Sequence, residues 1–269
     1  MPEPLTHADW LAGVPVLLAE TAALWDLTLG AAYPPGAAGY AVRAELPDGT
    51  PAVLKLAHPH RESLQEADAL ERWDGDGAVR LLARDDDRHA LLLERCEPGT
   101  FLSHSAGALD VLIGLLPRLW KSGAGFATLE SEAEIWAAGV AREVQDATLR
   151  DAALHYLREL PSTQGEQVLV HQDLHGENVL AAHREPWLVI DPKPLAAERE
   201  FSVAPIVRSF ELGHSKAEAL YRLDRLTAEL DLDRDRALGW TVAQTVAWSG
   251  GSDYWDVHID TVRWLLEDA

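Results

Sequence analysis

Apolar and polar positions along the first third of the chain predict one helix followed by short strands. In residues 6–25 the apolar side chains recur at mostly helical spacing, and Thr6 can cap the helix. Residues 61–74 show the same spacing and predict a second helix. Short apolar runs bounded by turn residues predict strands at 25–30, 51–57, 78–84 and 89–95. This part is therefore expected to be rich in strands, with a helix inserted among them.

Helical patterns dominate after the segment CEPGT at 96–100, where Pro and Gly punctuate the chain. Short strands, QVLV, NVLAA and WLVID, are expected only around residues 171–191. Helices are expected at 105–121, 131–160, 203–212, 215–230, 234–248 and 256–267. The pattern predicts an α+β protein with a β-rich N-terminal lobe at 1–95, which carries an extra N-terminal helix, and a mostly helical C-terminal lobe at 96–269. A small-molecule site is expected in the cleft between the lobes.

Composition narrows the class of protein. The 269 residues are 47% hydrophobic and 25% charged, which is typical of a folded globular chain. The formal net charge of −21 disfavours nucleic acid and anionic membrane surfaces as partners. It favours small cationic ligands, although such acidity also serves solubility alone. With a single cysteine, no secretory signal pattern and no long apolar run, a cytoplasmic location is expected.

The stretch HQDLHGENVL, residues 171–180, gathers histidines, carboxylates and an amide between two apolar runs. One interpretation is a zinc or iron centre built on His171, Asp173 and His175. A hydrolytic centre of that kind usually has three or more protein ligands with supporting partners, and no other His or Cys cluster stands out. A second interpretation is an ordinary polar turn.

Phosphoryl transfer is the third interpretation of the same stretch. Asp173 is followed five residues later by Asn178, and an apolar strand then ends at Asp191. A loop carboxylate can accept a hydroxyl proton, while an amide oxygen and a second carboxylate can hold Mg²⁺ against ATP phosphates. Because Asn178 and Asp191 stand at opposite ends of a predicted hairpin, their side chains can converge on one ion.

These segments resemble the aminoglycoside phosphotransferase family of the protein-kinase-like superfamily, in its streptomycin and hydroxyurea kinase group. The likeness is strongest in VHQDLHGENVL, WLVIDPKPL and EREF, and weaker in PAVLKLA, EADALERW and ALLLERCEPG. The resemblance implies a two-lobed protein-kinase-like fold, with a nucleotide-binding N-terminal lobe and a C-terminal lobe that holds the catalytic loop and acceptor site. It implies ATP and Mg²⁺ as cofactors, Asp173 as catalytic base, Asn178 and Asp191 as magnesium ligands, and Lys55 as a phosphate contact.

Lys55 alone is a weak signal, because an exposed lysine on a strand is common. Strand alternation puts it on the same face as Val53, and a glutamate from the following helix would hold a phosphate-binding lysine. Helical spacing and the resemblance around EADALERW favour Glu66 as that partner. Glu62 shares the same face and is the second choice, whereas Glu71 points away.

The resemblance further implies that main-chain groups of Glu94 and Cys96 meet adenine. Two departures from the family pattern stand out. The loop YPPGAAGYAV lacks a full G-x-G-x-x-G, so Gly36 and Gly39 either form a phosphate loop or only shape a hairpin. Ser202 replaces a frequent aspartate, which puts a supporting contact to the catalytic loop in doubt.

The acceptor is the least defined part of the prediction. Three acidic residues in WSGGSDYWDVHID could pair with guanidinium or ammonium groups, or could simply favour a turn and a helix start: Asp253, Asp256 and Asp260. We expect an ATP- and Mg²⁺-dependent small-molecule O-phosphotransferase, with a streptomycin-like acceptor. The alternatives are a kinase of another small metabolite alcohol and a nucleotide-binding module without transfer activity. The sequence does not predict an oligomeric state.

Overall fold

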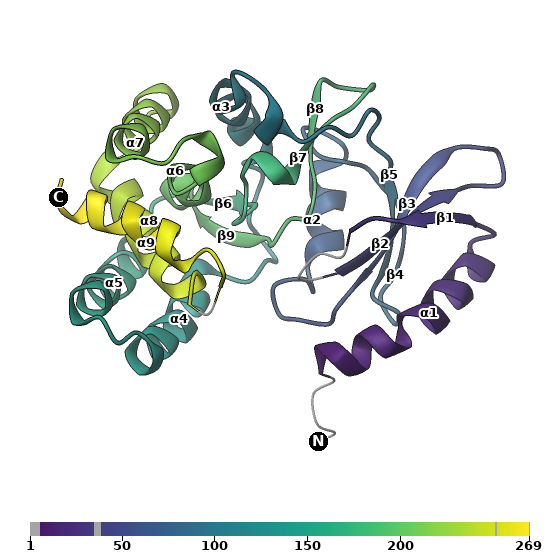
Figure 1. Ribbon diagram of the computed structural model, residues 1–269, viewed down its shortest axis with the longest axis horizontal. Helices are drawn as coiled ribbons and strands as arrows, with labels where there is room; N and C mark the ends of the chain where they lie inside the picture. Colours follow the sequence, from purple (N-terminus) through teal and green to yellow (C-terminus); the bar gives the residue numbers. More distant parts are fainter. Residues whose placement is uncertain (1–5, 35–38, 251, 269) are drawn as a thin grey trace.

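The computed structural model describes residues 6–34, 39–250 and 252–268, and it has two lobes (Figure 1). In the N-terminal lobe, five antiparallel strands are ordered β1-β2-β3-β5-β4. The elements of this lobe are α1 (His7–Leu24), β1 (Thr28–Ala32), β2 (Gly39–Glu45), β3 (Pro51–Ala57), α2 (Glu66–Trp73), β4 (Leu81–Asp85) and β5 (Ala90–Glu94). The sheet thus ends at the segment that the sequence marks as the boundary between lobes.

The two faces of this sheet pack differently. Leu54 and Leu56 of β3 are fully buried against α1, where Trp10 and Val14 complete a small apolar core. Successive strand residues point to opposite faces, so Val53 and Lys55 lie on the other face, which looks toward α2 and the second lobe. Strand alternation in β3 therefore puts Lys55 and Val53 on the face that lines a pocket shared by the two lobes.

The C-terminal lobe is mostly helical and surrounds α8, whose residues Ala237 to Val246 are all buried. A helix buried on every side is typical of the centre of a domain. Its helices are α3 (Ala108–Leu119), α4 (Leu129–Glu143), α5 (Ala147–Glu159), α6 (Ala204–Val207), α7 (Lys216–Leu230), α8 (Arg234–Trp248) and α9 (Trp255–Leu266). Its strands form two antiparallel pairs, β6 (Gln167–Val170) with β9 (Leu195–Glu198), and β7 (Val179–Ala181) with β8 (Trp187–Val189).

The structure corrects three of the predicted elements and adds one strand that was not predicted. The helix predicted at 61–74 begins only at Glu66, because residues 61–65 form turns. The segment 131–160 is two helices, since the Asp146 side chain caps α5 by accepting from two backbone amides. The segment 203–212 is divided among short helical turns around Pro205. Strand β9 was missed because its sequence, LAAE, carries little strand propensity and gains its pairing only from β6.

Helix α2 contacts its own sheet and is also hydrogen-bonded to the C-terminal lobe. The Trp73 indole donates to Leu119 O at 2.8 Å, and Arg72 donates to Ser122 O at 2.6 Å. Gln65, just before the helix, donates to Gly125 O at 2.9 Å. These contacts fix the position of α2 relative to both lobes, and therefore fix the position of Glu66 at its first turn. Within the described residues, no helix has the length and hydropathy to cross a membrane.

Candidate active site

The two lobes enclose a cleft of about 650 Å³, which is within the size range of small-molecule and cofactor sites. Apolar side chains from both lobes line its interior, including Val53, Val79, Leu93, Leu180 and Ile190. Lys55 and Asp191 also line it and are in contact, and Asn178 lies close by because its carbonyl accepts from Ile190 N. The charged residues Arg43, Glu94, Arg95 and Glu97 complete the lining. A largely apolar cleft with a cation, an amide and a carboxylate grouped together suits a ligand with an apolar body and an anionic part.

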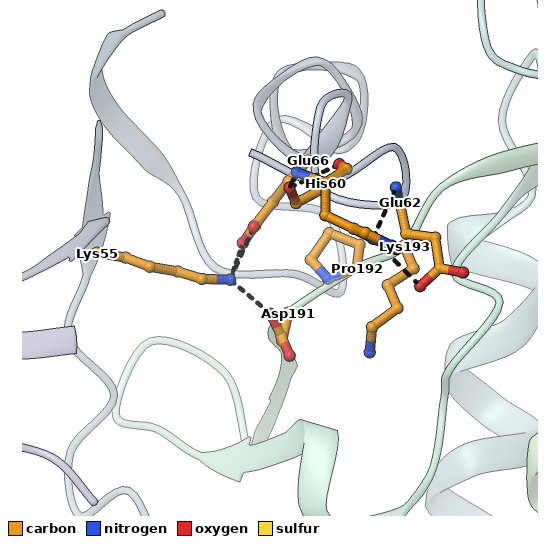
Figure 2. Close-up of a pocket in the computed structure, with 8 residues that line it drawn as sticks. Lys55, His60, Glu62, Glu66, Asp191, Pro192 and Lys193 are labelled. Atoms are coloured by element: carbon orange, nitrogen blue, oxygen red, sulfur yellow. Dashed lines mark hydrogen bonds and ion pairs between the residues drawn. The ribbon is translucent and has the colours of Figure 1, made fainter. Parts of the chain in front are cut away.

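Lys55 joins the two lobes within the cleft (Figure 2). Its Nζ lies 2.6 Å and 2.7 Å from the two carboxylate oxygens of Glu66 on α2. It also lies 2.5 Å from Oδ1 of Asp191, which follows β8 in the C-terminal lobe. Glu62, the second choice of partner, instead contacts His60 and Arg61. The structure therefore brings Lys55, Glu66 and Asp191 together, and Lys55 is not the exposed strand lysine of the alternative interpretation.

Charge controls protonation in this cluster. The positive charge of Lys55 is the largest influence on Asp191, and it holds the pKa of that carboxyl well below its usual range in spite of burial. Burial would lower the pKa of Lys55, but the charges of Asp191 and Glu66 outweigh it and raise that pKa. Lys55 is therefore a fixed cation and Asp191 a fixed anion. The backbone of Asp191 is left-handed, with φ 56°, so the chain turns sharply where the side chain enters the cleft.

Asp173 lies in the loop between β6 and β7, and its carboxylate is surrounded by cationic side chains. Lys193 Nζ donates to Oδ2 at 2.5 Å, while Arg208 and His175 approach Oδ1 at 3.7 Å and 4.0 Å. Burial would raise the pKa of Asp173, but the charges of these three neighbours outweigh it and lower that pKa. Asp173 is consequently an ionised acceptor for hydrogen bonds at neutral pH.

Asn178 stands between Asp173 and Asp191. Its Nδ2 donates to the backbone carbonyl of Asp173 at 2.7 Å, which leaves the amide oxygen for another partner. Asn178 and Asp191 both line the cleft. Among the described residues, no three His, Cys, Asp or Glu side chains gather in a way that could hold a metal ion. One amide and one carboxylate fit Mg²⁺, because this ion commonly takes one or two protein ligands and completes its shell with water and phosphate oxygens.

The histidines of the stretch at 171–180 have structural partners. His171 is buried, its Nε2 lies 2.9 Å from Ile190 O, and its Nδ1 accepts from the Asp173 amide at 3.2 Å. Both ring nitrogens are thus engaged by the backbone rather than free for a metal. Burial lowers the pKa of His171 to about 4, so this ring stays neutral. The Nδ1 of His175 instead pairs with Glu211 at 2.9 Å.

The segment between the lobes contains Glu94 and Cys96, which both line the cleft. The Glu94 side chain faces Arg184, with two contacts of 2.8 Å, so only its main chain is left for a ligand. Within the described chain, the Cys96 amide has no hydrogen-bond acceptor. Burial, with the nearby Glu94, raises the pKa of the Cys96 thiol to about 12, which is opposite to what a nucleophile requires.

The glycine-rich loop is only partly described. Gly36 lies outside the described residues. Gly39 begins β2 and lines the cleft, and a Cβ there would stand 3.1 Å from both Lys55 Cε and Leu56 O. A side chain at position 39 would therefore crowd Lys55.

The three acidic residues predicted for the acceptor differ in their surroundings. Asp253 and Asp256 are exposed at the start of α9. Asp260, one turn further on, already faces His214 at 3.5 Å and Arg263 at 3.8 Å. The chain just before α9 packs on the turn at 210–212, because Tyr254 stacks on Phe210 at 5.4 Å, and the next residue in that turn, Glu211, pairs with His175.

Sequence reasoning missed a second set of residues around Asp173. Besides Lys193, these are Arg208, whose guanidinium is buried, and Gln244 of α8. Gln244 accepts from Arg208 at 2.7 Å and donates to Gln172 O at 2.9 Å, so it supports the loop that carries Asp173. The signal for Lys193 was its place two residues after Asp191; Arg208 and Gln244 are distant in sequence and gave none.

The substitution at Ser202 changes what that position does. Its hydroxyl donates to Arg199 O at 2.5 Å and accepts from the Trp120 indole at 3.2 Å. One contact is to the preceding turn and the other is to Trp120 at the end of α3, and neither is to residues 171–178. The loop that carries Asp173 is contacted instead by Gln244, which donates to Gln172 O.

Known sequences similar to this chain are antibiotic resistance kinases and phosphotransferases. The aminoglycoside/hydroxyurea antibiotic resistance kinase family profile matches residues 25–255. A streptomycin 6-kinase of Streptomyces griseus is 37% identical over 92% of this chain and 84% of its own length. A hydroxyurea phosphotransferase of Kitasatospora aureofaciens is 40% identical over 88% of this chain and 73% of its own length.

Solved structures share the fold at low sequence identity. Choline kinase LicA of Streptococcus pneumoniae has a TM-score of 0.68 at 15% identity, covering 95% of this chain and 98% of the other. An aminoglycoside phosphotransferase, APH(4)-Ia, in complex with ADP and hygromycin B has a TM-score of 0.63 at 12% identity, covering 95% and 97%. The predicted two-lobed protein-kinase-like fold is confirmed. The chain belongs to the aminoglycoside/hydroxyurea antibiotic resistance kinase family and is a small-molecule phosphotransferase.

Proposed function

We propose that this protein transfers the γ-phosphoryl group of ATP, with Mg²⁺, to a hydroxyl group of a small cationic molecule of the streptomycin type. The observation that carries the proposal is the convergence, in a single cleft, of Lys55, Asn178 and Asp191 with Asp173 beside them. The similarity to streptomycin 6-kinases, 37% and 36% identical, supports the choice of acceptor.

Each residue of this set has a chemical task in the proposed reaction. Asp173 accepts the proton of the acceptor hydroxyl as its oxygen attacks the γ-phosphorus, the new P–O bond forms, and the bond to the β-phosphate oxygen breaks to release ADP. Lys55, held by Glu66, contacts the ATP phosphates. Main-chain groups of Glu94 and Cys96 meet adenine, in keeping with the unpartnered amide of Cys96 in the described chain.

Asn178 and Asp191 are the proposed ligands of Mg²⁺. When bound, the ion would neutralise charge on the ATP phosphates and on the transferring group. The lowered pKa of Asp191 supports this role, because its carboxylate stays ionised across the physiological range. The orientation of Asn178 supports it too, since the amide nitrogen is occupied by the Asp173 carbonyl and the oxygen is not.

A cationic acceptor suits the charge of the protein. The net charge of −21 attracts cations over a distance, and Asp253 and Asp256 are exposed at the start of α9. Asp260 is a weaker candidate than the other two because His214 and Arg263 already face it. Glu211 is a further candidate, since its carboxylate lies beside His175 near Asp173 and retains 14% exposure.

A second acceptor class follows from two specific observations. The chain is 40% identical to a hydroxyurea phosphotransferase, whose named substrate is small and uncharged, and it shares its fold with a choline kinase. A hydroxyl on a compact metabolite is therefore the alternative acceptor, with the same residues in the same tasks. A nucleotide-binding module without transfer is the remaining alternative.

The decisive experiment incubates purified protein with Mg-ATP and streptomycin, hydroxyurea, choline or a pool of small alcohols, and follows products by mass spectrometry. The proposal expects a phosphorylated product with streptomycin. Asp173→Asn is expected to lower kcat by about 10²- to 10⁴-fold, because a positioned general base is lost. Exclusive phosphorylation of another compound selects the second acceptor class. No product with any compound, together with ATP binding that Asp173→Asn leaves unchanged, selects the module without transfer.

A further inference from the structure

Lys193 lies between the cluster of Lys55, Glu66 and Asp191 and the proposed base Asp173. It follows Asp191 by two residues, and together with Lys55, Glu66 and Asp191 it lines a small cavity of about 20 Å³ (Figure 2). In Figure 2 no interaction joins its amino group to the other residues drawn, because that group reaches instead to Asp173 Oδ2 at 2.5 Å. One lysine thus connects the phosphate end of the cleft with the proposed base.

The contact with Asp173 uses only part of what the ammonium group offers. An ammonium group has three hydrogen-bond donors, and within the described residues Lys193 Nζ makes a single hydrogen bond. The side chain is 18% exposed, and its Nζ lies 5.7 Å from the Trp248 ring centroid, so the ring supports the charge without consuming a donor. Two donors therefore remain for a group that enters the site.

The two remaining N–H donors of Lys193 lie near the place where the acceptor hydroxyl would meet the phosphoryl group. In the proposed reaction, the acceptor hydroxyl oxygen lies about 2.6 to 3.2 Å from the Asp173 carboxylate. An ammonium group 2.5 Å from Oδ2 is then within about 6 Å of an acceptor oxygen bound at Oδ2. The oxygens of a phosphoryl group in line with that acceptor are within reach of a flexible four-carbon side chain.

We propose that Lys193 is a catalytic residue, which pairs with Asp173 before substrates bind and then contacts the oxygens of the transferring phosphoryl group; this inference rests on the proposed function. During transfer the acceptor O–P bond forms, the bond between the γ-phosphorus and the β-phosphate oxygen breaks, and Asp173 takes the hydroxyl proton. Lys193 keeps its own protons throughout. Moving from the carboxylate to the phosphoryl group frees Oδ2 for the hydroxyl and balances charge on the group being transferred.

The test measures how tightly the protein binds Mg-ADP with and without aluminium fluoride, which mimics a transferring phosphoryl group. Isothermal titration calorimetry should show a gain in affinity of at least about tenfold for the wild type when fluoride is present. Lys193→Met should reduce that gain to under about threefold and leave the affinity for Mg-ADP alone within about threefold. It should also lower kcat by about 10²- to 10³-fold, as the loss of one preorganised donor does elsewhere.

Three further variants separate a catalytic role from a structural one. Lys193→Arg keeps the charge and should recover part of the fluoride gain. Lys216→Met removes an exposed lysine that pairs with Glu267 on the surface and should behave as wild type. In an Asp173→Asn background, Lys193→Met should still reduce the gain, because the phosphoryl contact does not require the carboxylate. Thermal melting checks that each variant is folded. If Lys193→Met is not, the double variant Asp173→Asn, Lys193→Met carries the test, because it leaves neither charge of the pair unpartnered.

Four outcomes overturn the proposal. Aluminium fluoride does not raise the Mg-ADP affinity of the wild type, or it raises the affinity of Lys193→Met by the same factor. Alternatively, Lys193→Met weakens Mg-ADP binding without fluoride as much as with it, or Lys193→Met has no effect on the fluoride gain once Asp173 is replaced. A failure of the proposed acceptor looks different. In that case streptomycin is not phosphorylated, but the fluoride gain persists in the wild type and still depends on Lys193.

Discussion

The two halves of the site have opposite charge balance. In the clamp formed by Lys55, Glu66 and Asp191, one cation faces two carboxylates at 2.5 to 2.7 Å. Around Asp173, one carboxylate faces Lys193, Arg208 and His175 at 2.5 to 4.0 Å. Glu211 partly offsets the second group by pairing with His175.

This difference gives each half a preferred partner. Burial raises the pKa of Glu66, and when that carboxyl is ionised the clamp has one negative charge in excess, so it is prepared for a cation such as Mg²⁺ next to Asp191. The group around Asp173 has one positive charge in excess when His175 is protonated, even with Glu211 counted, so it is prepared for an anion. A phosphoryl group that enters between them meets the metal on one side and the cations on the other. Substitutions that disturb one half can therefore be compared with the other half as reference.

The largest effect is expected from removing the cation of the clamp. Lys55→Met leaves Glu66 and Asp191 without their shared cation, and breaking a buried ion pair from one side costs about 3 to 5 kcal/mol. The free energy of unfolding, measured by urea denaturation without Mg²⁺, should fall by roughly that amount. The double variant Lys55→Met, Glu66→Gln should recover part of the loss, because one of the two carboxylate charges is gone.

The matched control for this substitution is again Lys216→Met on the exposed surface of α7, which should change the free energy of unfolding by less than about 1 kcal/mol. Adding Mg²⁺ should restore part of the stability of Lys55→Met, since the ion supplies the missing positive charge. A Lys55→Met protein as stable as the control would show that the clamp does not carry the excess negative charge argued above.

His171 contacts both halves of the site, because its ring meets Ile190 O next to Asp191 and the backbone amide of Asp173. Its effect on the free energy of unfolding depends on pH. Burial lowers the pKa of the folded protein's His171 from the ordinary 6.5 to about 4. The unfolded chain therefore takes up a proton first as pH falls, so the stability that His171 provides is complete above pH 6.5 and is lost progressively toward pH 4. The loss amounts to about 3 kcal/mol.

Urea denaturation of the wild type and His171→Asn between pH 7 and pH 4 measures this loss. The variant should be less stable at pH 7 but should lose less stability on acidification. His155→Asn, at an exposed position on α5, should keep the wild-type slope. Parallel slopes in wild type and His171→Asn would contradict a neutral, buried ring between the two halves.

The sequence predicted the clamp better than the group around Asp173, for a physical reason. Lys55 is positioned by strand alternation and Glu66 by helical spacing, so each follows from a local period. Asp191 closes a short hairpin whose β7 and β8 pair in register, which local pattern also predicts. Residues whose position depends on a local period can be predicted from a single segment of the sequence.

The surroundings of Asp173 depend on tertiary packing. Gln244 reaches Gln172 from a helix 72 positions later, and Arg208 reaches Gln244 from 36 positions away. No periodicity relates these positions, and Gln244 is one of several polar residues in α8, so the sequence does not single it out. Strand β9 was not predicted for the same reason: its pairing with β6, and not its composition, makes it a strand.

Gln244 offers a way to disturb only the Asp173 half. Gln244→Leu leaves the Gln172 carbonyl and one Arg208 donor without their partner, which should cost about 1 to 3 kcal/mol of stability. Because the loop that carries Asp173 loses its support, kcat should fall by about tenfold. Calorimetry should find Mg-ADP affinity unchanged, and Gln145→Leu at an exposed position should alter neither quantity. Weakened nucleotide binding in Gln244→Leu would mean that the two halves are not separable.

The smallest effects are expected at the rim, where the acceptor would meet α9. Asp253 and Asp256 are exposed, and a single exposed ion pair with a cationic acceptor is worth about 0.2 to 1 kcal/mol. Asp253→Asn and Asp256→Asn should therefore raise the acceptor KM by up to about fivefold and leave the ATP KM unchanged. Asp260→Asn should change neither, because His214 and Arg263 already face that carboxylate. Steady-state kinetics with streptomycin distinguishes the three, and a larger effect at Asp260 than at the other two would place the cationic group of the acceptor further along α9.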